Sequence, residues 1–253
     1  MSEAIENLSA ILVTLRNKLL VIAAVLLTGI IVSFQFTSPL IERMKIDLLP
    51  EGAKLVYVSP LEVMMLELKL SIIIGLLITL PIVAFYIYKA ISRRYSIKVP
   101  VSIGKGQFLF LSVAVVIMFV FGAAYSYFLM LPLFLKFLYM DAESAGVTAT
   151  YSIFKFISFI ATTTAIFGLV FELPVVLTFL TRNGFVQYRT LVTYRKHIYV
   201  LAMFVAALVT PGADVFSQMM VAVPMIAFFE ISMVIVRIIG VKNKVSKPDS
   251  SLS

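Results

Sequence analysis

One acidic residue inside a long apolar stretch limits what this chain can fold into. Residues 151–180 are apolar enough to span a lipid bilayer, yet Glu172 lies well inside them. Placing an acidic side chain near the centre of a membrane helix costs roughly 2.5 to 3.5 kcal/mol, so we expect Glu172 to face protein or trapped water. Steps of four and three residues back from Glu172 lead to small side chains on one helix face, Gly168, Ala165, Ala161 and Ser158. That face lets another helix or a bound peptide approach closely.

Pro174 indicates where this helix bends. Because proline has no backbone N–H, the carbonyl of Val170 loses its helical partner, and we expect a bend beside Glu172. Acidic residues inside membrane spans usually have a functional role. A purely structural hydrogen bond from Glu172 to a neighbouring helix is the alternative.

The composition places the whole chain in a membrane. Of its 253 residues 61% are hydrophobic, and the mean hydropathy is +1.06. A soluble domain needs more polar residues to cover its surface, so the sequence predicts an all-α polytopic membrane protein. With no cysteine and a single histidine, we expect no metal site and no cofactor. No basic run with interleaved aromatic residues indicates a nucleic-acid partner.

Apolar runs predict six membrane-spanning helices in a single domain, residues 1–240. The expected spans are about 19–36, 68–91, 107–131, 153–180, 198–210 and 215–239. An amphipathic helix over residues 2–18 is expected on the membrane surface before the first span. We expect residues 37–58, which include Pro39, to form an ordered loop outside the membrane, Pro132 to end the third span, and 241–253 to form a disordered tail.

The fifth span is unusually short. A helix from Ile198 to Thr210 rises only about 20 Å, against a hydrocarbon core about 30 Å thick. Either the helix stops short or the bilayer thins around it.

The segment Ser59-Pro60-Leu61-Glu62 predicts the start of the second helix. Serine at the N-cap, proline at N1 and glutamate at N3 form a capping box. Glu62, Glu67 and Lys69 are then expected near the outer mouth, where a structural ion pair is their expected role.

The distribution of positive charge predicts the topology. Most of the 21 lysines and arginines fall in the N-terminal segment, in the connections after the second and fourth spans, and in the tail. Cytoplasmic segments carry such an excess, so we expect both termini of this cell-membrane protein in the cytoplasm. The same basic segments favour contact with anionic lipid.

The sequence contains no enzyme signature. A serine elbow, an HExxH pair, a Walker loop and a GxGxxG loop are all absent. Membrane-embedded polar groups remain, on helices that carry Pro174 and Pro224: Glu172, Glu230, Gln218 and Ser217. Bent helices with polar groups on one side form a concave, wettable surface, which suits an inserted peptide, protons or a solute.

Several local patterns together resemble the TatC family, the multispanning receptor subunit of the twin-arginine protein translocase. They are Ser59-Pro60-Leu61-Glu62 with Lys69, Phe121-Gly122-Ala123-Ala124-Tyr125-Ser126-Tyr127-Phe128 with Pro132, Phe171-Glu172-Leu173-Pro174, Thr210-Pro211, Asp214-Val215-Phe216-Ser217-Gln218, Pro224 and Phe229-Glu230. Each pattern is weak alone. Their order and spacing over about residues 11–238 make the combination specific.

This resemblance implies a non-enzymatic receptor, a concave cup of six helices with cytoplasmic termini. Such proteins bind the signal peptides of folded cargo, which carry paired arginines, and assemble with single-span TatA- and TatB-like subunits into an oligomeric complex. Transport in the family is driven by the proton motive force. Glu172 then matches the family's intramembrane acid, and the face with Ser158, Ala165 and Gly168 is a track for a signal helix.

The resemblance also implies partner contacts and structural roles. A partner's single span is expected between the fifth and sixth helices, at Pro211, Asp214, Ser217, Gln218 and Glu230. Structural roles are expected for Pro60, Glu62, Lys69, Pro81, Gly122, Tyr127, Pro174 and Pro224.

The chain departs from the family where paired arginines would bind. The family has a glutamate two residues before Arg16, where this chain has Thr14, and a glutamate in its first cytoplasmic loop, where residues 92–106 have no acid. Arginines pair with carboxylates, bidentately where possible. We therefore expect the acids to come from the N-terminus, Glu6 first, or from a partner, with Arg16 as a further candidate.

Two other functions stay open. A divergent TatC paralogue would keep the scaffold and the TatA-type contacts but leave arginine recognition to another subunit. A proton-coupled small-solute carrier would use Glu172 and Glu230. Carriers usually contain an internal repeat with matched broken segments, and no convincing repeat is present here.

Overall fold

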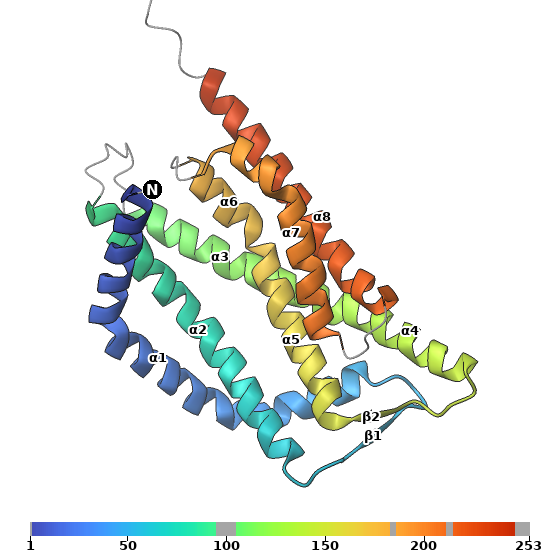
Figure 1. Ribbon diagram of the computed structural model, residues 1–253. Helices are drawn as coiled ribbons and strands as arrows, with labels where there is room; N and C mark the ends of the chain where they lie inside the picture. Colours follow the sequence, from blue (N-terminus) through green and yellow to red (C-terminus); the bar gives the residue numbers. More distant parts are fainter. Residues whose placement is uncertain (1, 95–104, 183–185, 211–214, 246–253) are drawn as a thin grey trace, which may run out of the picture. The chain divides into compact units, whose positions relative to one another are not determined.

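The computed structural model describes the backbone of residues 2–94, 105–182, 186–210 and 215–245 (Figure 1). The chain divides into two compact units, residues 1–108 with 139–161 and residues 109–138 with 162–253. Across the described ranges, six helical segments are long and apolar enough to cross a membrane, the number predicted. Their bounds are Leu19–Leu48, Glu62–Leu80, Val113–Ser144, Ile153–Thr181, Tyr188–Val209 and Val215–Ile238.

In the first unit, the long helices α1 (Ser2–Leu48) and α2 (Glu62–Arg94) pack side by side (Figure 1). Their backbones come close where Gly29 faces Gly75: a Cβ atom added to Gly75 would lie 2.7 Å from Cγ1 of Ile30. Lipid tails are as apolar as leucine, so membrane helices associate through such tight packing of small residues.

Helix α1 continues through Pro39, so the loop predicted from residue 37 is wrong as far as Leu48. The amphipathic residues 2–18 belong to the same continuous helix, and α2 likewise continues through Pro81. A proline ends helices readily in water, where released backbone groups find new partners. In an apolar environment those groups find none, so continuing past the proline costs less than ending the helix.

A small parallel sheet joins the connections between the spans in the first unit. Strand β1 (Lys54–Val56) pairs with β2 (Thr150–Ser152), and Lys54 lies opposite Thr150. The turn before β1 is closed by a 3.1 Å hydrogen bond from the N–H of Ala53 to the carbonyl of Pro50. Gly52 has a φ of 91° in this turn, a backbone conformation that favours glycine.

Glu62 ties the start of α2 to β2. Its Oε2 accepts a hydrogen bond from the backbone N–H of Val58 at 3.2 Å, and its Oε1 accepts one from Oγ of Ser152 at 3.0 Å. The predicted capping box placed this carboxylate on the N–H of Ser59, so the observed contact lies one residue earlier. Pro60 was predicted as the first helical residue, but it lies in the turn before the helix, which begins at Glu62.

The ion pair predicted around Lys69 is wrong. Glu67 accepts a 2.6 Å hydrogen bond from Oγ of Ser38, and the ammonium of Lys69 lies 5.5 Å from the ring centroid of Phe154. Both charged groups therefore contact neighbouring elements of the first unit, through a hydroxyl and an aromatic face.

The third span runs well past Pro132, contrary to the prediction. Helix α3 (Lys105–Tyr125) passes through the π-helical turn η1 (Ser126–Met130) into α4 (Leu131–Ser144). The N–H of Leu131 donates to the carbonyl of Ser126, and this wider turn stands directly before the proline. Tyr127 lies in the widened turn, with its ring edge-on to Phe128 at 5.1 Å.

The second unit contains most of the remaining helices, α5 (Ile153–Phe171) from Thr162 onward, α6 (Leu173–Arg182), α7 (Tyr188–Val209) and α8 (Val215–Val245). A buried cluster joins α6, α7 and α8: Leu177, Leu191, Phe229, Met233 and Val236. Helix α8 continues through Pro224, as α1 does through Pro39.

Helix α7 is longer than predicted. It begins at Tyr188 instead of Ile198, so its 22 residues rise about 33 Å, enough to cross the hydrocarbon core. The basic residues Arg189, Arg195 and Lys196 are helical, although we expected them in a connection.

Gly122 gives a direct test of packing in the second unit. A Cβ atom at this position would lie 2.5 Å from the carbonyl oxygen of Phe167 and 2.7 Å from Cβ of Phe171. We expect Gly122→Ala to lower the free energy of unfolding in detergent by roughly 1–3 kcal/mol, because backbone atoms would have to move. Gly29→Ala is the control, since its methyl group would meet Cα of Gly75 at 3.3 Å. Equal losses for the two variants would contradict this packing.

Candidate functional site

The fourth span breaks at Glu172, as Pro174 predicted. Helix α5 ends at Phe171 and α6 begins at Leu173, leaving Glu172 in the turn between them. The N–H of Glu172 donates to the carbonyl of Leu169 at 3.1 Å, and the carbonyl of Glu172 accepts from the N–H of Val176 at 2.9 Å. Both backbone groups of Glu172 are therefore satisfied at the break, and the carboxylate projects from a helix junction.

The carboxylate of Glu172 is half-buried and makes no hydrogen bond or ion pair with any group that the structure describes. A structural hydrogen bond to a neighbouring helix was the alternative explanation for this residue. Within the described ranges no such bond holds it. An acid at membrane depth needs water, a proton or a visiting ligand to offset its cost.

Aromatic rings hold the residues next to Glu172 in place. The Phe171 ring centroid lies 3.8 Å from that of Phe228 on α8 and 5.5 Å from that of Tyr125 on α3. Tyr125 also contacts Phe167 at 5.9 Å and Phe228 at 5.6 Å. The end of α5 is thus fixed between two other helices of the second unit, with Gly122 leaving room for it.

The small-residue face of α5 is partly filled by the chain itself. A Cβ atom at Gly168 would lie 2.4 Å from the ring of Phe119, so α3 occupies the space that this glycine leaves. Ser158 and Ala161 are buried, and Ala165 is half-buried. Gly168 therefore serves packing within the chain, and the track for a signal helix along this face stays a prediction.

Sequence reasoning missed a run of hydroxyls on α5. Thr162, Thr163 and Thr164, like Ser158, have buried hydroxyl oxygens without a hydrogen-bond partner in the described part of the chain. Three successive threonines in an apolar span were a visible signal. Such groups provide sites for water inside the membrane domain.

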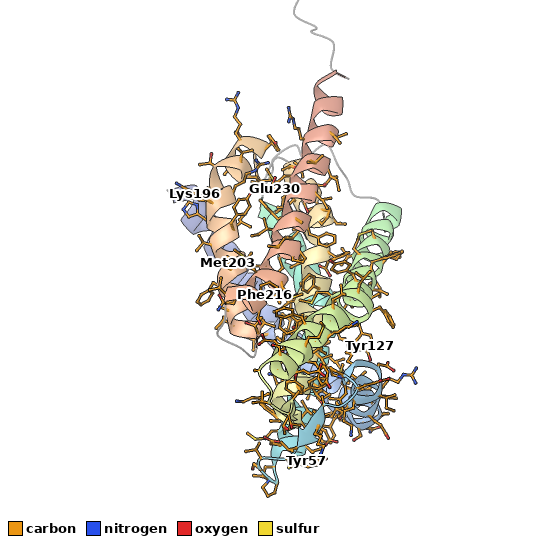
Figure 2. The ribbon with its side chains drawn as sticks, turned by 90° about the vertical axis from the view of Figure 1, so that its right-hand side faces the viewer. Tyr57, Tyr127, Lys196, Met203, Phe216 and Glu230 are labelled. Carbon is orange, nitrogen blue, oxygen red and sulfur yellow. The ribbon has the colours of Figure 1, made fainter. Side chains whose placement is uncertain are left out.

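Glu230 is paired within the chain. One carboxylate oxygen accepts a hydrogen bond from the Tyr199 hydroxyl, and the other lies 3.0 Å from Nη2 of Arg195, both on α7 (Figure 2). The sequence suggested a partner-helix contact for Glu230, whereas in the structure it bonds α8 to α7. Arg195 and Tyr199 were not connected to Glu230 by any local pattern, because about 30 residues separate the two helical positions.

Of the other residues predicted to contact a partner helix, the structure describes two and leaves two undescribed. Ser217 is fully buried and Gln218 half-buried in the first turn of α8, beside Phe216, whose ring centroid lies 4.2 Å from that of Phe137. Pro211 and Asp214 lie outside the described residues. The contact with a partner helix therefore stays a prediction at Pro211 and Asp214.

The predicted arginine-binding residues lie on helix α1, but their side chains are outside the described part. Glu6 and Arg16 have helical backbone in α1. Of residues 92–106, the backbone is described only up to Arg94 and from Lys105. Among the described residues, no group of histidine and carboxylate side chains is placed to hold a metal ion.

Comparison with known proteins gives one family. Residues 10–224 match the family model of the Sec-independent protein translocase protein TatC. The chain is 30% identical to the TatC protein of Aquifex aeolicus over 91% of its own length and 94% of that protein. It is 28% identical to the TatCy protein of Bacillus subtilis, over 87% and 85% of the two chains. A crystal structure of the twin-arginine translocase receptor TatC matches with a TM-score of 0.78 and 28% identity, covering 90% of this chain and 98% of that one.

The pair between Arg195 and Glu230 should stabilise the α7–α8 contact. We expect Glu230→Ala to lower the free energy of unfolding in detergent by about 1–3 kcal/mol, because it leaves the guanidinium of Arg195 without its partner. The double variant Arg195→Met with Glu230→Met should lose less than the summed losses of Arg195→Met alone and Glu230→Met alone. Lys196→Met, an exposed neighbour, is the control. Additive losses would mean that the pair contributes no coupling.

Proposed function

Because this chain belongs to the family of the Sec-independent protein translocase protein TatC, we propose that it binds the twin-arginine signal peptides of folded proteins. It is a multi-pass membrane protein and a subunit of a translocase. In this proposal both termini lie in the cytoplasm, as the distribution of lysine and arginine favours. TatA- and TatB-type single-span proteins assemble with it, and the proton motive force drives transport.

The observation that carries the proposal is the carboxylate of Glu172. It sits at a helix break inside a membrane span and has no partner among the described residues. The rings around Phe171 fix its backbone, so the acid is held in one place without a partner among the residues that the structure describes. A signal peptide that enters the membrane domain supplies the missing polar partner, either from its own backbone or with water.

Hydroxyls on α5 support the same proposal. The side chains of Ser158 and Thr162 lie four residues apart on one helix face, and Thr164 lies two turns before Glu172. Buried oxygens without partners favour water along this helix. A hydrated helix face lowers the cost of bringing the polar groups of a peptide to the depth of Glu172.

Recognition of the arginine pair is assigned to the N-terminal part of α1. Thr14 stands where the family has an acid, and residues 92–106 carry basic residues and no acid, so that loop repels a pair of arginines. Glu6 is the nearest acid on α1 to Arg16. In this proposal Glu6 accepts the arginines of the signal peptide.

The same departures favour one second candidate, a TatC paralogue that leaves arginine recognition to another subunit. Such a protein keeps the membrane scaffold and its contacts with single-span partners. It does not support export alone in cells that lack their own TatC, whereas a complete receptor does.

Crosslinking with two matched signal peptides tests the proposed function. We expect a photo-crosslinking peptide with paired arginines to label the reconstituted protein more strongly than the same peptide with paired lysines, because only arginine pairs bidentately with carboxylates. Glu6→Gln should remove this preference.

Glu51→Gln is the control, since this exposed acid lies between the first two spans, away from the N-terminal segment of α1. Equal labelling by the two peptides would rule out arginine recognition by this chain. Loss of the preference in Glu51→Gln would place the recognition elsewhere.

A further inference from the structure

In the first turns of α2 the polar side chains face the same unit, beside the buried Leu66 and Leu70, and the exposed side of the helix is apolar. Glu62, Glu67 and Lys69 contact Ser152, Ser38 and Phe154 of the same unit. The outer stripe, which we define by its exposed apolar residues, consists of Leu61, Met64, Met65, Leu68, Ile72 and Leu76. These positions follow steps of three and four residues, so they share one helix face. A helix end that faces water has polar side chains on its exposed side and apolar side chains on its buried side.

Exposed apolar residues are also present in the connection that precedes the helix. Tyr57 is 65% exposed and Val58 is 74% exposed, and Val56 at the end of β1 is exposed as well (Figure 2). Lys54 is exposed two residues before Val56, so both side chains leave the same face of the strand. Exposed apolar surface of this kind marks a contact with another apolar phase or molecule.

The residue types of the outer stripe favour lipid over protein as the partner that covers it. Where α2 packs against α1 it has small residues, with Gly75 facing Gly29. The outer stripe has none, and its members are leucine, isoleucine and methionine. Farther along α2 the same face belongs to a segment that is long and apolar enough to cross a membrane, where exposed leucine and isoleucine suit contact with lipid.

We propose that the β1–α2 connection, residues 54–61, is inserted into the interface of the bilayer. Val56, Val58 and Leu61 extend the lipid contact of the outer stripe, and the ring of Tyr57 lies at the level of the headgroups, where tyrosine is enriched. The stem of Lys54 runs along this surface, and its ammonium reaches the lipid phosphates. The partner is therefore a phospholipid surface, and the small β1–β2 sheet rests on it.

A single tryptophan tests this proposal, because the natural chain contains no tryptophan. Three variants of the full chain, Tyr57→Trp, Met65→Trp and Glu51→Trp, are reconstituted in vesicles of phosphatidylethanolamine and phosphatidylglycerol. Their emission is measured with brominated acyl chains in the bilayer and, separately, with iodide in the water. Tyr57→Trp is a conservative change at an exposed position, and a thermal unfolding curve for each variant checks that the fold is kept.

The proposal predicts a blue-shifted emission for Tyr57→Trp that brominated lipid quenches and iodide does not. Met65→Trp, eight residues beyond Tyr57 and one helical turn beyond Leu61, should be quenched by bromines placed deeper in the acyl chains. Glu51→Trp, in the polar turn of the same connection, should be quenched by iodide alone. The proposal fails if Tyr57→Trp behaves like Glu51→Trp, which would place the connection in water. It also fails if neither quencher reaches Tyr57→Trp, which would indicate that a protein covers it.

Discussion

The cost of a charged group in a low-dielectric membrane is the constraint on which the rest of this structure depends. Each acid or base within a span must find a partner or a source of water. Glu230 has Arg195 and Tyr199, Glu67 has the hydroxyl of Ser38, and Lys69 has the ring of Phe154. These contacts join helices to one another. Glu172 differs from them, because its carboxylate has no such partner in the described chain.

Consequently, the residues at the end of α5 that pack against other helices are distinct from Glu172, the residue with the proposed binding role. At Gly168 and Phe171 the helix is held by Phe119, Tyr125 and Phe228, through close approach and aromatic contacts. The next residue leaves the helix and carries the unpaired acid. A rigid support under a polar group is what a binding site needs, because little of the binding free energy is then spent on ordering it. In a TatC-family protein this arrangement suits a receptor that admits a hydrophobic peptide without a fixed sequence.

Much of this fold can be predicted from the sequence. The wrongly predicted helix ends at proline have a common physical cause. The apolar runs predicted six spans, and Pro174 predicted the break at Glu172. The predictions that helices end at Pro39 and Pro132 were wrong. Proline ends helices in water because the released backbone groups bind water, and that gain is lost in an apolar environment. The early start of α7 was missed because Arg195 has the sequence signature of a connection. Its partner Glu230 lies on another helix, and only the tertiary structure brings the two together.

We propose that Glu172, whose carboxylate has no partner among the described residues, lies where a signal peptide enters. The chain contains no cysteine, so Glu172→Cys gives a single thiol that can be oxidised to a disulfide with a cysteine in the hydrophobic segment of a twin-arginine peptide. We expect a disulfide at position 172 and none for Ile231→Cys, an exposed position on α8. Equal crosslinking at both positions, or none at position 172 with a peptide that still binds, would contradict it.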